Sequence, residues 1–167
     1  MIPHFINRER ELEYLENLYK QKEFKLVVLY GRRRVGKTEL IKHFLKGKEG
    51  TYLLATDESV GENIKEFKNK FFELTKKDYF LKIETENFHD LFKYLADEIG
   101  ERRVVIAIDE FSYLLNLNKG LLSAFQKIID ELLKKTKIML ILCGSSLSIM
   151  ENDVLGYRSP LYGRDVS

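Results

Sequence analysis

Four short apolar runs constrain the fold of this 167-residue chain more than any other feature. Each run is apolar at successive positions and rich in aliphatic residues, which is typical of strands buried on both faces. They cover residues 24–30, 51–55, 104–108 and 138–143. Because stretches with helical apolar spacing alternate with them, the sequence predicts an α/β fold with a parallel sheet covered by helices on both sides.

The helical stretches are recognised by apolar residues three and four positions apart. In the first of them, Leu12, Leu15 and Leu18 share one face, and Asn7 lies where a helix N-cap would stand. We expect helices at residues 8–20, 38–45, 64–74, 88–99 and 121–133. We expect one core domain over residues 1–167, in which residues 1–23 form an N-terminal box and helix and residues 153–167 form a loosely ordered tail.

A glycine-bearing segment joins the first apolar run to the second helical stretch. It consists of Gly31, Arg32, Arg33, Arg34, Val35, Gly36, Lys37 and Thr38. The segment fits the pattern G-x-x-x-x-G-K-[ST], in which glycines let backbone N–H groups close around phosphates. The helix that follows points its N-terminus at them. We therefore predict that the segment binds a nucleoside triphosphate, with Lys37 on the β- and γ-phosphates and Thr38 on Mg²⁺.

The three arginines of this segment leave two interpretations open. They can contact phosphate or a partner, or they can form a solvated basic loop. A nucleic-acid module is a third and weaker hypothesis for the chain, because no aromatic stacking motif lies beside the arginines. The net charge of +2 does not favour a nucleic-acid partner either.

An acidic pair, Asp109 and Glu110, follows the third apolar run. A carboxylate at that place can hold Mg²⁺, through water, opposite the phosphate segment, and we assign this role to Asp109. Glu110 can orient or deprotonate an attacking water. The alternative is that both acids only favour the dipole of a following helix. Together with the phosphate segment, and without the N-K-x-D of guanine-binding proteins, the pair favours ATP hydrolysis.

The fourth apolar run ends in Cys143, Gly144, Ser145 and Ser146. Ser145 can sense the γ-phosphate or help to hold the water, or a serine here can cap the next helix. Cys143 is the single cysteine, and we expect it to be a small buried apolar residue. A lone cysteine predicts a cytoplasmic location. No apolar stretch approaches the roughly 20 residues of a membrane span.

Several motifs in one order make the chain resemble the archaeal ATPase family of the AAA+ and STAND P-loop group. These are the phosphate segment, the box at residues 5–12 (FINREREL), residues 106–111 (IAIDEF), residues 143–146 (CGSS) and residues 159–164 (SPLYGR). The resemblance implies a P-loop NTPase core of the ASCE type, with strand order 5-1-4-3-2 and with ATP and Mg²⁺ as ligands.

The resemblance also implies roles for single residues. It places Lys37 and Thr38 on phosphate and Mg²⁺, Asp109 on Mg²⁺, and Glu110 as the hydrolytic carboxylate. Further implied roles have equally good alternatives. Phe5, Ile6 and Asn7 would lie near the adenine or would form a helix cap with a hydrophobic staple. Arg164 would stabilise charge, or would be a surface arginine in the tail.

The chain departs from the family in its length, because members continue past residue 164 into a fifth strand, a helical lid and a further domain. We therefore expect a sheet without the fifth strand, no lid, and completion as a homo-oligomer or by a C-terminal domain on another chain. Two functional hypotheses remain: an ATPase, and a non-hydrolysing switch or remnant that holds ATP or ADP.

Overall fold

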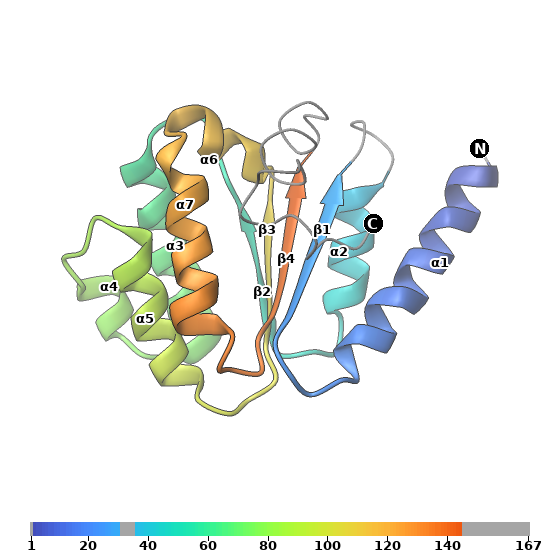
Figure 1. The fold of residues 1–167 in the computed structure, drawn as a ribbon, viewed down its shortest axis with the longest axis horizontal. Helices are drawn as coiled ribbons and strands as arrows, with labels where there is room; N and C mark the ends of the chain where they lie inside the picture. Colours follow the sequence, from blue (N-terminus) through green and yellow to red (C-terminus); the bar gives the residue numbers. More distant parts are fainter. Residues whose placement is uncertain (1, 31–35, 145–167) are drawn as a thin grey trace.

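The computed structural model describes residues 2–30 and 36–144. Its elements, in chain order, are α1 (Ile2–Tyr19), β1 (Lys25–Tyr30), α2 (Lys37–Leu45), β2 (Gly50–Leu54), α3 (Val60–Thr75), α4 (Tyr79–Lys82), α5 (Phe88–Ile99), β3 (Val105–Asp109), α6 (Phe111–Leu117), α7 (Gly120–Lys127), the π-helix η1 (Ile128–Leu133) and β4 (Met139–Gly144). Their alternation confirms the predicted α/β class (Figure 1).

The four strands form one parallel sheet in the order β1-β4-β3-β2. This is the 1-4-3-2 part of the order that the family resemblance implies. The expected lack of a fifth strand and lid is not tested by the described residues and stays a prediction. All four strands point toward the same edge of the sheet in Figure 1, so their carboxyl ends lie together.

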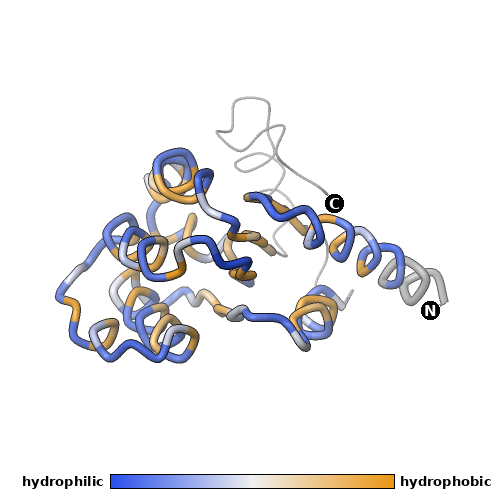
Figure 2. The backbone as a smooth tube through the Cα atoms, turned by 90° about the horizontal axis from the view of Figure 1, so that it is seen from below, coloured by the Kyte–Doolittle hydropathy of each residue, from blue (hydrophilic) through white to orange (hydrophobic). Residues whose placement is uncertain are grey.

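Helices cover both faces of the sheet. Helices α3 to α7 and η1 lie on one side, and α1 and α2 lie on the other (Figure 1). Each side has its own apolar cluster, and the alternate residues of a strand contribute to different clusters: Val28 faces the larger cluster and Val27 the smaller. In Figure 2 the strands, which are largely apolar, accordingly lie in the middle of the molecule, between the helices.

Local sequence explains why the helices form where they do. In α5 the residues Leu91, Phe92 and Leu95 are fully buried, as the helical spacing predicts. The helix begins after Asn87, whose side chain accepts a hydrogen bond from the Asp90 N–H. Helix α3 begins in the same way after Ser59. A capped, amphipathic helix of this kind is fixed by its own residues and by the sheet it covers.

Two predictions about helices need correction. Asn7 is not an N-cap, because α1 already begins at Ile2, and Pro3 lies in the first turn of this helix, where proline is tolerated. The stretch 121–133 is not one α-helix, because α7 gives way to η1. Because a π-helix has more residues per turn than an α-helix, the four buried apolar residues of η1 lie within a narrower arc around the helix axis than they would in an α-helix. The short helices α4 and α6 were not predicted.

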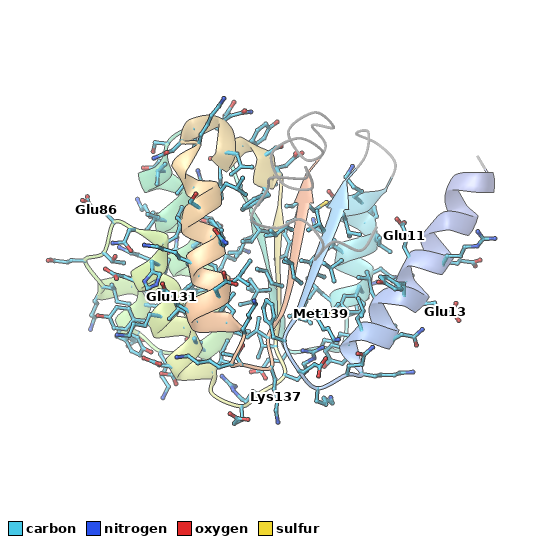
Figure 3. The ribbon with its side chains drawn as sticks, in the orientation of Figure 1. Glu11, Glu13, Glu86, Glu131, Lys137 and Met139 are labelled. Carbon is cyan, nitrogen blue, oxygen red and sulfur yellow. The ribbon has the colours of Figure 1, made fainter. Side chains whose placement is uncertain are left out.

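Arg103 ties together the amino end of the sheet. Its guanidinium donates hydrogen bonds to the carbonyl oxygens of Leu18 (2.9 Å), Tyr19 (3.1 Å), Glu23 (2.6 Å) and Lys137 (2.6 Å). These carbonyls belong to the end of α1, the turn before β1 and the turn before β4, and Figure 3 shows Lys137 at this end of the molecule. We call Arg103 and its four acceptors the amino-end clamp.

Within the described ranges, no helix is both long and apolar enough to cross a bilayer.

Candidate nucleotide-binding site

The phosphate segment is described from Gly36 onward. Gly36 has φ 83° and ψ 18°, a left-handed conformation that glycine adopts without the steric cost of a Cβ. It directly precedes α2, and its carbonyl accepts from the Leu40 N–H at 2.8 Å. Because Gly36 has no side chain to cap the helix, it leaves the first N–H groups of α2 to an anion. The predicted ligands Gly31, Arg32, Arg33, Arg34 and Val35 lie outside the described residues.

Asp109 is the last residue of β3, and only 4% of it is exposed. Three donors hold its carboxylate. The Thr38 hydroxyl donates to Oδ2 at 2.7 Å, the Tyr52 hydroxyl donates to the same oxygen at 2.5 Å, and the Glu110 N–H donates to Oδ1 at 2.8 Å. The two motifs that the sequence places 71 positions apart therefore meet through Thr38 and Asp109.

Glu110 follows Asp109 in a left-handed conformation, with φ 56° and ψ 39°. A residue with a Cβ adopts this conformation at a cost of about 1–2 kcal/mol. Its carbonyl accepts from the Tyr113 N–H at 2.9 Å, which begins α6. This backbone turn makes the side chains of Asp109 and Glu110 leave the strand end in different directions. Strained backbone of this kind is concentrated at functional sites.

A pocket of about 200 Å³ joins these groups. It is lined by Gly36, Lys37, Thr38, Glu39, Asp109 and Glu110. The predicted residues Lys37, Thr38, Asp109 and Glu110 thus share one cavity, and Glu39, in the first turn of α2, is a lining residue that the sequence analysis did not single out. Ser145, Ser146 and Arg164 lie outside the described ranges.

The residues present fit a magnesium ion. Thr38 offers a hydroxyl and Asp109 a carboxylate, and Mg²⁺ binds hard oxygen ligands of this kind. In proteins, Mg²⁺ usually keeps several waters besides one or two protein ligands. Among the described residues, no group of three or more His, Cys, Asp or Glu side chains is placed to hold a metal by itself.

Tyr52 is a further side chain at Asp109 that the sequence analysis did not single out. Burial raises the pKa of its phenol, and the Asp109 carboxylate raises it further, so the hydroxyl stays protonated and available as a donor. Tyr52 pairs with Ala107 across β2 and β3, and its long side chain reaches Asp109, which pairs with Leu54. A tyrosine two positions before the end of a strand was the only signal in the sequence.

Cys143 is buried and free, as predicted. Burial raises the pKa of its thiol, and nearby Asp109 adds to the effect. The thiol therefore stays protonated and unreactive.

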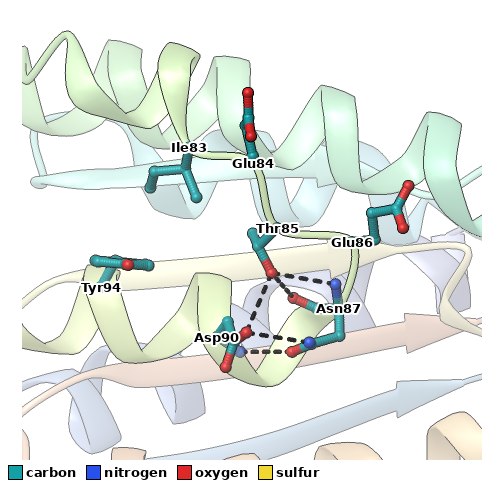
Figure 4. A pocket seen from close by; sticks show the side chains of 7 residues that line it. All are labelled: Ile83, Glu84, Thr85, Glu86, Asn87, Asp90 and Tyr94. Atoms are coloured by element: carbon teal, nitrogen blue, oxygen red, sulfur yellow. Dashed lines mark hydrogen bonds between the residues drawn. The ribbon is translucent and has the colours of Figure 1, made fainter.

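A second pocket, of about 360 Å³, lies away from this edge of the sheet, between α4 and α5 (Figure 4). Its polar groups are used for local structure. Thr85 donates to the Asn87 carbonyl at 3.4 Å, and the Asn87 amide donates to Asp90 at 3.1 Å, which together form the start of α5. We therefore place the functional site at the carboxyl edge.

Sequence similarity assigns the chain to a family. Residues 5–166 match the model of a family described as an ATPase domain predominantly from Archaea. The chain is 41% identical over 160 residues to an uncharacterised protein of Methanocaldococcus jannaschii, covering 96% of this chain and 34% of that protein. A second protein of this organism, named as ATP-binding, is 56% identical over 45 residues, which are 27% of this chain and 76% of that protein.

Solved structures show the same fold. A Walker-type ATPase of Pyrococcus abyssi superposes with a TM-score of 0.67 at 28% identity, over 95% of this chain and 52% of that one. The ORC2 protein of Aeropyrum pernix, solved as ADPNP and ADP complexes, superposes with a TM-score of 0.65 at 18% identity, over 96% of this chain and 46% of that one. The chain thus spans about a third of the first relative and about half of these structures. It belongs to the family of ATPase domains found predominantly in Archaea, with a P-loop NTPase fold.

Proposed function

We propose that the chain binds ATP together with Mg²⁺ at the carboxyl edge of its sheet and hydrolyses the ATP. The observation that carries the proposal is the 2.7 Å hydrogen bond from Thr38 to Asp109, with Lys37 and Glu110 in the same pocket. It joins the end of a phosphate loop to an acidic strand end, which are the two parts that phosphoryl transfer requires. The relative named as ATP-binding points to the same ligand.

Each described residue has a distinct role in this proposal. The N–H groups that follow Gly36 and the Lys37 ammonium bind the phosphates. Thr38 and Asp109 hold Mg²⁺, which neutralises charge that develops on the phosphate oxygens. Glu110 orients the attacking water and accepts its proton. From the sequence alone, Gly31 to Val35 complete the phosphate cradle and Ser145 assists at the γ-phosphate.

The second candidate is a switch that holds ATP or ADP without turnover. One observation favours it: Thr38 and Glu39 are exposed, so the pocket stands open to solvent. Phosphate binding is local, whereas positioning a water requires closure of the site. Closure of the site by a second copy or by another chain would convert the switch into an ATPase. We therefore propose a protein partner of this kind rather than a nucleic acid. A cytoplasmic location is part of the same proposal.

Phosphate release from the purified chain, measured over many turnovers with Mg·ATP, separates the two candidates. For an ATPase, Glu110→Gln should lower release roughly a hundredfold or more, because the water loses its base, while ATP binding persists. Glu84→Gln makes the same chemical change on the exposed loop before α5 and should leave release unaltered. Equal release by the unaltered chain and by Glu110→Gln would contradict hydrolysis at this site.

A further inference from the structure

We propose that Tyr52 is a positioning residue for Asp109, and that its hydroxyl sets the affinity of the site for Mg²⁺. The inference rests on the proposed function, since it concerns the same pocket. It assigns a role in the metal site to a residue of β2, outside both the phosphate loop and the acidic pair.

The first step is the geometry around the carboxylate. Tyr52 and Thr38 both donate to Oδ2 of Asp109, and the Glu110 N–H donates to Oδ1. Donors on both oxygens fix the plane of the carboxylate. Hydrogen bonds to an ionised group are also stronger than those between neutral groups. The orientation of Asp109 is therefore set by its neighbours before any ligand arrives.

The second step is the difference between the two hydroxyl donors. Thr38 is exposed in the first turn of α2 and is itself a proposed metal ligand, so its surroundings change when nucleotide and metal bind. Tyr52 is not a ligand in this arrangement. Its ring packs against the apolar cluster on the α2 side, and the Lys42 ammonium lies 5.0 Å from the ring centre. Of the two hydroxyl donors, Tyr52 is thus the one that we expect to stay with Asp109 both before and after nucleotide and metal bind.

The third step is the position of β2 in the sheet. Among the described strands β2 is an edge strand, and β3 lies next to it. Tyr52 therefore approaches the Asp109 carboxylate from the side of β2. Its hydroxyl donates to that carboxylate, and Asp109 is almost fully buried. Groups that orient metal ligands commonly change metal affinity by about 10- to 100-fold when they are removed.

The test compares Tyr52→Phe with Tyr94→Phe. Both lose one phenol hydroxyl, but Tyr94 is an exposed residue of α5 away from the site. ATP binding is measured by calorimetry over a series of Mg²⁺ concentrations and in excess chelator. Direct Mn²⁺ binding, followed by electron paramagnetic resonance, gives a second readout that requires no turnover.

We expect Tyr52→Phe to raise the Mg²⁺ concentration at half-saturation roughly tenfold, at the lower end of that range because the Glu110 N–H still donates to Oδ1 of Asp109. Mn²⁺ binding should weaken in parallel, ATP affinity in chelator should stay unchanged, and Tyr94→Phe should behave like the unaltered chain. An unchanged or lower half-saturation concentration in Tyr52→Phe would overturn the inference.

Two further outcomes are distinct from this one. If ATP affinity in chelator falls together with Mg²⁺ affinity, or if Tyr52→Phe no longer folds, the hydroxyl has a structural role and the inference is wrong. If the unaltered chain binds no ATP at all, the proposed function fails first, and the inference fails with it. Melting curves of both variants without nucleotide complete the comparison.

Discussion

At the amino end of the sheet, Arg103 donates hydrogen bonds to four backbone carbonyls. At the carboxyl end, Asp109 accepts hydrogen bonds from three different segments, and a pocket lies beside it. At the carboxyl end, the backbone of Glu110 is left-handed. The hydrogen bonds of the amino-end clamp are all made within the protein, whereas polar groups of the site face a pocket that can hold a ligand. Substitutions at the two ends should therefore separate stability from binding.

The largest expected effect is on stability, at the amino-end clamp. Arg103→Met keeps an apolar stem but removes the donors of four carbonyls, which should lower the free energy of unfolding by about 3 kcal/mol. Chemical denaturation measures the loss. The neighbouring Arg102→Met removes an exposed pair with Glu49 and a long hydrogen bond of 3.4 Å to the Ile99 carbonyl, and it should cost about 1 kcal/mol or less. Similar losses in the two variants would contradict the clamp.

The next effect is on binding, at the carboxyl end. Lys37→Ala removes the one side-chain cation that lines the described pocket, so ATP affinity should fall roughly thirtyfold or more. Lys65→Ala, on the exposed face of α3, serves as the matched control in calorimetric titrations. An equal loss of ATP affinity in both variants would show that net charge, rather than the pocket, attracts the nucleotide.

A smaller effect should expose the strain at Glu110. Glu110→Gly accepts the left-handed backbone without a Cβ and should raise the free energy of unfolding by about 1 kcal/mol, while hydrolysis is lost. Glu110→Ala loses the same carboxylate but keeps the Cβ, so it should not gain this stability. Denaturation of the two variants side by side measures the difference. A more stable alanine variant would show that the backbone is not strained there.

The smallest effect concerns a surface counterpart of the Tyr52–Asp109 pair. Tyr79 donates to Glu98 at 2.8 Å, and its pKa is raised to about 12, mostly by burial and then by Glu98. Because this pKa lies above the ordinary value of 10.0, the contribution of Tyr79 to stability is complete below pH 10 and is lost as pH rises toward 12. Tyr79→Phe should flatten the fall in melting temperature across that range. An equally steep fall would contradict the assignment.

The fold could be predicted because its signals are local and repeated. Strands apolar on both faces, such as 104–108, and helices with a buried stripe, such as 88–99, each indicate their own structure. The wrong predictions concern residues that are compatible with more than one conformation. Asn7 is a good cap but is also tolerated inside a helix, and the apolar stripe of 121–133 suits both α and π winding.

The candidate site was predictable only as far as its motifs reach. Lys37, Thr38 and Asp109 follow from spacing, because a phosphate loop and an acidic strand end must meet at one edge of a parallel sheet. Tyr52 does not follow, because its contact with Asp109 depends on β2 lying beside β3 and on a side chain long enough to reach along the strand. Contacts of this kind arise from the assembled sheet.

Calorimetric titration of the purified chain with ATP, in Mg²⁺ and again in chelator, tests the central claim most directly. We expect saturable binding at one site, stronger in Mg²⁺ than in chelator and greatly weakened in Lys37→Ala. Absence of binding heat in the unaltered chain at several temperatures, or identical binding by Lys37→Ala, would contradict the assignment of the carboxyl edge as a nucleotide site.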